Sequence, residues 1–181
     1  MWYTGLNGNM RIGYATSKDG INWEKYAGNP VLDLGEPGSW DSQHVANPTV
    51  LYENGVYKMW YTGCDKNMQI GYATSKDGIN WEKYAGNPVI DIGAWSNCPQ
   101  SDIWSPSVLF DGVEYKMWYT SFDERMKIGY ATSVDGIHWS KYTTAPVLES
   151  GISGAWDDRG VWAPCVIFHN SEYKMWYNGW N

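Results

Sequence analysis

The sequence is poor in cysteine and contains no C-x-x-C pair. Its three cysteines, Cys64, Cys98 and Cys165, are an odd number at wide spacings, so we expect neither a disulfide framework nor a structural zinc site. Cys165 lies in an apolar segment and is predicted to be a thiol of the core. His44 has no second His or Cys at ligand spacing, so no metal site is expected, and no motif indicates a cofactor.

Basic charge and long apolar runs are also lacking. The chain has 13 Lys and Arg against 20 Asp and Glu, a formal net charge of −7 and no basic run, which argues against nucleic acid or an anionic membrane as a partner. Apolar stretches such as residues 161–168 are too short to span a bilayer. Met1 opens directly into a repeat segment, with no charged and then apolar leader, so we expect no export signal and a cytoplasmic or undetermined location.

What the sequence does contain is a repeat of 58 residues. The segment that begins at Met1 returns at Met59, Met117 and, cut short, Met175, and residues 12–31 and 70–89 are identical. Such a period indicates one supersecondary unit that is copied around a ring or along an array. We expect a single domain, 1–181, with repeats 1–58, 59–116 and 117–174 and a closing strand 175–181. The near-identity of two copies indicates recent duplication or deliberate design.

Each repeat is predicted to hold four short strands. In one copy these are residues 103–110, 115–120, 126–133 and 139–147, which are aromatic and β-branched and lie between turn residues. Asp-Gly pairs at 19–20, 77–78 and 135–136 fit tight turns between the third and fourth strands, so their Asp residues are interpreted as structural. Small residues around Gly71 leave room for an aromatic ring, and we expect Trp60 to lie there.

A proline in each first strand (Pro48, Pro106 and Pro164) places that strand at a sheet edge. The predicted fold class is therefore all-β, a β-propeller of four-stranded antiparallel blades whose first strands line the axis. The chain has one strand more than three blades need, so the termini overlap. The last two strands could complete the first blade, or two or more chains could combine into a larger ring as a homo-oligomer, since propellers usually have about four to eight blades.

The loops that precede the first strands should meet at one mouth of such a ring. We expect catalytic carboxylates there, and aromatic faces beside carboxylates suit a small carbohydrate, whose C–H face stacks on the ring. Two carboxylates could act as acid and nucleophile at about 5–5.5 Å, or as acid and base at about 6.5–9.5 Å. The alternative is that the Asp residues cap loops and the Trp residues seal the core. The catalytic candidates are Asp41, Asp102, Asp157 and Asp158, and the substrate-binding candidates are Trp40, His44, Trp104, Trp156, Arg159 and Trp162.

Several blocks carry a family resemblance. The blocks YKMWYTG (57–63), IGYATSxDGIxWxKYxxNPV (70–89) and WxPxV (104–108) resemble the blades of glycosidase-type β-propellers, the furanosidase and mannoside phosphorylase superfamily that includes glycoside hydrolase families 43, 62, 32, 68 and 130. The resemblance implies five blades and three acidic residues, typically two Asp and a Glu, on inner strands. By position the matches are Asp41, Asp102 and Asp157 or Asp158. This chain departs from the pattern in having three repeats and no inner-strand Glu, for which Glu36 is a distant substitute.

The resulting expectation is a glycoside hydrolase that acts on small furanosides or short oligosaccharides through an axial cluster of Asp residues. Two alternatives stay open. One is a carbohydrate-binding propeller without catalysis, in which aromatic rings stack on sugar and carboxylates bind hydroxyls. The other is a fragment or designed ring that has no enzymatic activity.

Overall fold

The computed structural model describes residues 1–90, 102–142 and 145–181, and these residues form strands and turns only. Cys98 lies outside the described residues. None of the described residues form a helix that could cross a membrane. The strands are β1 (Trp2–Asn7), β2 (Asn9–Thr16), β3 (Glu24–Lys25), β4 (His44–Glu53), β5 (Val56–Cys64), β6 (Met68–Ser75), β7 (Glu82–Lys83), β8 (Asp102–Phe110), β9 (Tyr115–Phe122), β10 (Met126–Ser133), β11 (Ser140–Lys141), β12 (Gly160–His169) and β13 (Glu172–Trp180).

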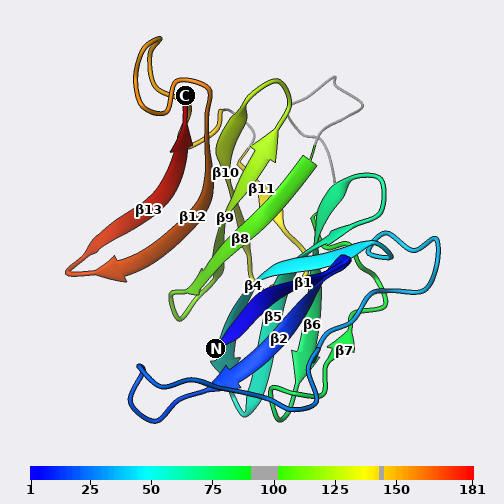
Figure 1. Cartoon of the computed structure of the whole chain (residues 1–181). Helices are drawn as coiled ribbons and strands as arrows, with labels where there is room; N and C mark the ends of the chain where they lie inside the picture. Colours follow the sequence, from blue (N-terminus) through cyan, green and yellow to red (C-terminus); the bar gives the residue numbers. More distant parts are fainter. Residues whose placement is uncertain (91–101, 143–144) are drawn as a thin grey trace.

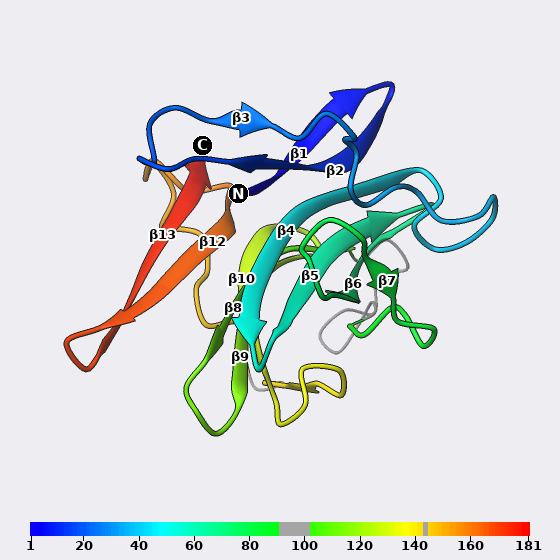
Figure 2. The same ribbon diagram turned by 90° about the horizontal axis from the view of Figure 1, so that it is seen from below.

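These strands form blade-like antiparallel units that follow the repeat. β4–β7 pair in chain order, and β8–β11 repeat the same pattern. β1–β3 lack a first strand, and β12 and β13 form a hairpin that is joined to β10 by a single parallel bridge. The units are arranged around a common axis with β4, β8 and β12 on the inside (Figures 1 and 2). The all-β propeller architecture is therefore observed as an arc of blades.

Apolar clusters fill the spaces between neighbouring units. Trp60 and Tyr72 of one unit pack against Tyr115 and Met117 of the next, and all four are buried. The indole N–H of Trp60 donates to the carbonyl of Gly136 in the adjacent unit at 2.8 Å. Because each sheet is covered on both faces in the middle of the arc, large side chains alternate on both sides of a strand such as β5.

Three structural expectations are corrected. Trp40, and not Trp60, covers Gly71, where an added Cβ would lie 2.6 Å from the Trp40 ring. Cys165 is exposed, because the alternation of β12 turns Val166 toward the core cluster and the thiol away from it. One of the two arrangements considered for the termini, closure of the ring by the last two strands, is also absent from the described residues, since β1 keeps its place on β2 while β13 bonds only β12.

The fourth strand of each repeat is much shorter than predicted. It comprises only two residues in β3, β7 and β11, followed by an isolated bridge such as Ile70 to Ile90. In the second unit the intervening Asn87 side chain bonds the backbone N–H and carbonyl of Tyr72, which replaces the strand ladder over this stretch. Residues 143–144 of the predicted strand 139–147 lie outside the described residues.

Candidate functional site

The predicted Asp-Gly turns hold their carboxylates by local bonds. Asp19 accepts the backbone N–H groups of Ile21 and Asn22, each at 2.8 Å, and the hydroxyl of Ser17 at 2.9 Å. These bonds, above all those from Asn22, keep the pKa of Asp19 well below its usual range. Gly20 has φ +75°, a conformation that glycine adopts without strain. Asp77 and Asp135 repeat these bonds.

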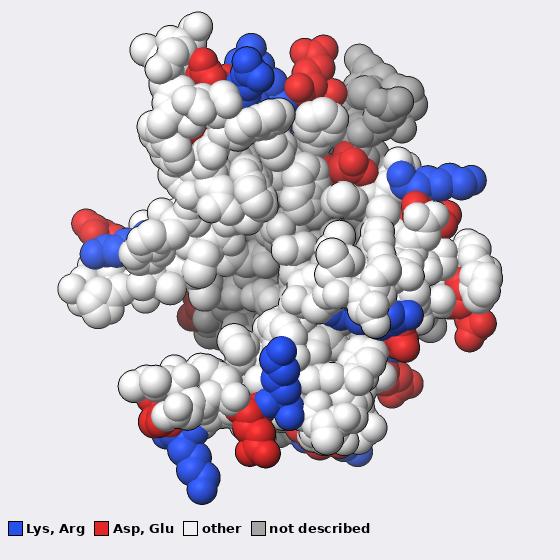
Figure 3. Space-filling view, in the orientation of Figure 1, with Lys and Arg blue, Asp and Glu red and all other residues white. Residues whose placement is uncertain are grey.

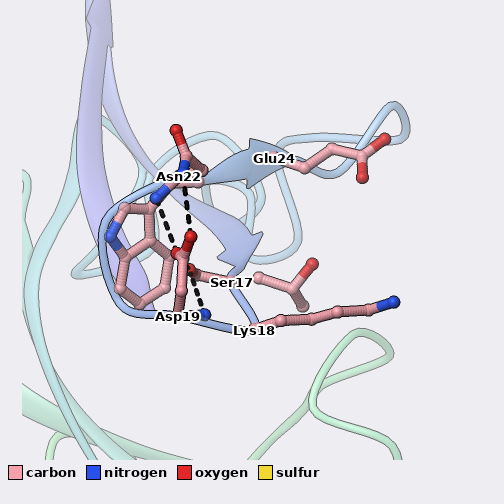
Figure 4. Close-up of a pocket in the computed structure, with 7 residues that line it drawn as sticks. Ser17, Lys18, Asp19, Asn22 and Glu24 are labelled. Carbon is pink, nitrogen blue, oxygen red and sulfur yellow. Dashed lines mark hydrogen bonds between the residues drawn. The ribbon is translucent and has the colours of Figure 1, made fainter.

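A surface hollow of about 610 Å³ lies beside the first of these turns. Figure 4 shows that the Asp19 carboxylate faces Asn22 and Ser17, whereas Lys18 and Glu24 extend away from it. The polar groups of the turn are therefore occupied by one another. Since the arrangement recurs in three repeats, we interpret it as a fold element and not as the site.

A smaller cavity lies where the inner strands β4, β8 and β12 begin. It has a volume of about 190 Å³ and draws its lining from six strands in different repeats. It is smaller than the roughly 300–1,000 Å³ that is usual for ligand pockets. The lining residues are Met10, His44, Ala46, Asn47, Thr62, Cys64, Met68, Trp104, Ser105 and Trp162. Three of the predicted sugar-binding residues, His44, Trp104 and Trp162, are thus brought together.

The inner strands bulge at the residue that precedes each proline. Asn47, Ser105 and Ala163 have φ angles of 50°, 51° and 51°, and the strand register shifts at each of these places. The N–H of Ser105 donates to Thr62 Oγ1 at 3.0 Å, and Asn47 and Ala163 make the equivalent bond to a threonine. Non-glycine residues at positive φ are strained and persist where the surroundings fix them.

Ser105 carries the clearest sign of a missing partner. Its side chain belongs to a residue that is 5% exposed and lines the cavity. Its Oγ atom has no hydrogen-bond partner among the described residues. Buried polar atoms are nearly always paired, with protein, water or ligand, so this hydroxyl is a candidate for direct contact with a bound molecule. Sequence reasoning missed both Ser105 and Asn47, although the change of residue type before each proline was a readable signal.

Two predicted residues hold the neighbouring unit at the rim of the cavity. Asp102 Oδ1 accepts the N–H of Met68 at 2.7 Å, and His44 Nδ1 accepts the N–H of Met10 at 3.1 Å. Since Nδ1 of His44 is an acceptor, the neutral ring carries its proton on Nε2, which is then a donor. Asp102 is half-buried and keeps a second carboxylate oxygen.

Asp102 and Asp65 both act on the thiol that lines the cavity. Burial, followed by the negative charges of Asp102 and Asp65, raises the pKa of Cys64. Asp65 accepts the Ser42 hydroxyl and the Gln43 amide at 3.1 and 3.2 Å. Two carboxylates therefore lie close to one edge of the cavity, and the one at Asp65 was not predicted.

The other predicted carboxylates lie away from the cavity lining. Asp41 is 2% exposed, and its Oδ2 accepts Lys83 Nζ at 2.7 Å and the Tyr61 hydroxyl at 3.1 Å. Burial and this carboxylate raise the pKa of Tyr61. Asp157 occupies the equivalent position in the last unit, and Asp158 accepts the N–H of Gly154 at 2.8 Å. None of these three carboxylates lines the cavity, and their convergence with Asp102 at one mouth stays a prediction.

The remaining aromatic and basic candidates pack on the outer elements. Trp40 contacts Tyr61, with ring centroids 5.7 Å apart, and Trp156 stacks on Tyr177 at the same distance. The guanidinium carbon of Arg159 lies 6.0 Å from the Trp180 ring centroid. None of the three lines the cavity. Among the described residues, no group of three or more His, Cys, Asp or Glu side chains could hold a metal ion.

Family comparison agrees with this architecture. Residues 52–178 match the model of the glycosyl hydrolases family 32 N-terminal domain. The chain belongs to this family. It stands within the superfamily of five-bladed propellers that also includes glycoside hydrolase families 43 and 130.

Individual relatives extend over almost the whole chain. An uncharacterised protein of Mycobacterium tuberculosis is 31% identical over 99% of this chain and 62% of its own length, and an invertase of Schizosaccharomyces pombe is 30% identical over 92% of this chain and 30% of its own. The solved structure of a thermostable family-43 glycoside hydrolase is similar in fold, with a TM-score of 0.75 and 19% identity over 98% of this chain and 60% of that one. This chain thus spans only part of the length of each of these relatives.

Proposed function

We propose that this family 32-type chain binds one sugar unit of a small furanoside or short oligosaccharide in the 190 Å³ cavity and takes part in cleaving its glycosidic bond. The observation that carries the proposal is the unpartnered Ser105 hydroxyl in a cavity that also holds two tryptophans. The matching family is one of glycosyl hydrolases and one relative is an invertase, which makes sugar the expected ligand class. A sugar ring presents C–H faces for the indoles and hydroxyls for Ser105 and His44.

For bond cleavage, Asp102 is the first candidate among the predicted acids. Its Oδ1 is fixed by the Met68 N–H, so its orientation at the rim is set by the backbone. Glycoside hydrolysis ordinarily needs two carboxylates on either side of the bond. We propose Asp65 as the second carboxylate, because it lies with Asp102 near the edge of the cavity where Cys64 is found. In this arrangement one carboxylate protonates the leaving oxygen, and the other acts as base or nucleophile.

Activity on a panel of aryl furanosides and pyranosides tests the catalytic part of the proposal. Asp102→Asn keeps an oxygen for the Met68 N–H and removes the acid, so hydrolysis should fall by about 10²–10⁴-fold. Asp111→Asn, at an exposed position in the turn between β8 and β9, is the matched control and should retain activity. Undiminished hydrolysis by Asp102→Asn would contradict the assignment of this residue.

Carbohydrate binding without turnover is the second candidate function. The favouring observation is that no carboxylate is among the described residues that line the cavity. Titration of the chain with sugars should quench the fluorescence of Trp104 and Trp162, and Ser105→Ala should weaken the response. Quenching that depends on Ser105 in a chain with no hydrolysis would support this function over the first.

A further inference from the structure

The last hairpin of the arc exposes residues that are buried elsewhere in the same molecule. Trp176 in β13 is 59% exposed, whereas Trp60 and Trp118 at equivalent repeat positions are 0% and 8% exposed. β13 is also an edge strand, bonded only to β12 among the described residues. Figure 3 shows a notch between the lobe of β12 and β13 and the lobe that carries the β2–β3 turn. Edge strands that expose aromatic side chains are sites of pairing with another chain.

The two ends of the chain each hold half of an ion pair that is complete in the middle. In the second unit Lys83 lies 5.9 Å from the Tyr61 ring centroid and bonds Asp41 at 2.7 Å. In the first unit Lys25 lies at the same distance, 5.9 Å, from the equivalent ring of Tyr3, without an ion-pair partner among the described residues.

The complementary half is in the last unit. Asp157, 7% exposed, corresponds to Asp41 in the repeat, and its carboxylate has no hydrogen-bond or ion-pair partner among the described residues. Its oxygens are not among the fully enclosed unpartnered polar atoms of the described residues, so a cation can reach this carboxylate. The lysine that would pair with it by analogy belongs to a fourth strand of the kind that carries Lys25 and Lys83. The charges at the two ends are therefore complementary.

The indole hydrogen bonds show the same division. Trp2 and Trp60 donate to the carbonyls of Gly78 and Gly136 in the next unit, at 2.8 Å in both cases. The Trp118 indole has no acceptor of this kind among the described residues. The carbonyl of Gly20, in the first turn, accepts from Trp23, and among the described residues it accepts from no tryptophan of another unit.

β1 and β13 are copies of one strand. Residues 1–5 and 175–179 differ only where Thr4 is replaced by Asn178. β1 pairs with β2 through a six-residue register, and β13 could form the same register with another β2 at similar free energy, because four of the six side chains are identical. This is the situation in which identical elements exchange between protomers.

From these observations we propose that β13 of one chain pairs with β2 of a second copy, whose β2–β3 turn completes the unit begun by β12 and β13. Asp157 then pairs with Lys25 of the second copy. The indole of Trp118 donates to the carbonyl of its Gly20, and Trp176 is covered in the way that Trp2 is covered in the first unit. The β1 segment of the second copy is released in this exchange.

Light scattering on the full chain over a range of concentrations tests the association. The chain mass is 20.6 kDa, and the expected result is a concentration-dependent rise toward twice this value. Asp157→Lys and Lys25→Asp should each raise the dissociation constant by about tenfold or more, and the double variant should recover most of the loss because the pair is restored with reversed charges. Lys66→Asp, an exposed lysine in the β5–β6 turn, is the matched charge control.

A competitor provides a second measurement that does not depend on variants folding. A peptide of the sequence 12–31, which contains the β2–β3 turn and Lys25, should occupy β13 and return the chain to a mass of 20.6 kDa. A chain that has this mass at every concentration overturns the proposal, even if the peptide binds, since the occupant is then not a second copy. Single and double charge variants with the same association would also overturn it. If the chain is monomeric and the double variant still restores what each single charge reversal loses, Asp157 and Lys25 meet within one molecule. This result would also overturn the proposal.

Discussion

The complete unit β4–β7 and the hairpin β12–β13 are built from nearly the same sequence in different surroundings. Trp60 is fully buried, and Trp176 at the equivalent position is 59% exposed. Asp41 is bonded by lysine, tyrosine and serine, whereas Asp157 has no such partner among the described residues. The difference shows that in this fold the neighbouring unit, and not the residue or its own strand, decides how much a side chain stabilises the molecule.

The largest expected effect comes from removing the equivalent tryptophans. Trp60→Ala leaves a cavity in the core between two units and deletes the bond to Gly136, so it should lower the free energy of unfolding by about 3–5 kcal/mol. Trp176→Ala, measured in dilute protein, should change it by about 0.5 kcal/mol or less, as for an exposed residue. Chemical denaturation followed by circular dichroism compares the two. Equal losses would show that the exposed hairpin is packed in solution.

A smaller difference is expected between the two buried aspartates. Asp41→Ala leaves Lys83 without its carboxylate and removes the acceptor of the Tyr61 hydroxyl, which should cost about 2–4 kcal/mol. Asp157→Ala should cost about 1 kcal/mol or less, because no cation faces it in the described chain. Thermal unfolding at low protein concentration measures both. A large loss for Asp157→Ala alone would reverse the comparison.

The smallest difference concerns equivalent glycines. A Cβ at Gly63 would lie 2.2 Å from the Trp40 ring and 2.7 Å from Asp41 Cβ, so Gly63→Ala should destabilise by about 1–3 kcal/mol. At Gly5 the nearest atom is 3.9 Å away, and Gly5→Ala should be within about 0.5 kcal/mol of the parent. The midpoints of urea unfolding test this pair. If Gly5→Ala were as harmful as Gly63→Ala, the first unit would be covered in solution.

Much of the fold followed from local patterns. The repeat period, the alternation of aromatic residues and the prolines of the inner strands predicted the strands and their order, because backbone bonding and strand edges depend on nearby residues. The fourth strand was predicted to be too long, since the side-chain bonds of Asn87 that replace its ladder leave no periodic signal. Ring closure could not be decided locally, because β1 and β13 are equally good partners for β2.

The candidate site was predictable only in part. His44, Trp104 and Trp162 were found because they lie beside the inner-strand prolines. Asp41 and Asp157 were placed at the mouth by the same reasoning, but both residues are largely buried and neither lines the cavity. The change of residue type before each proline could have drawn attention to Ser105, but the lack of a partner for its hydroxyl depends on the bulge and on atoms from another repeat.

The bulge before each inner-strand proline has a consequence for how such a chain can change its ligand. At Asn47, Ser105 and Ala163 the backbone N–H donates to a threonine of the preceding unit, which fixes the backbone shape. The same backbone shape therefore occurs with an amide, a hydroxyl or a methyl side chain. Packing of the blades thus does not depend on which side chain stands at these three positions. New recognition chemistry could be installed at the centre one residue at a time, while the framework around it stays unaltered.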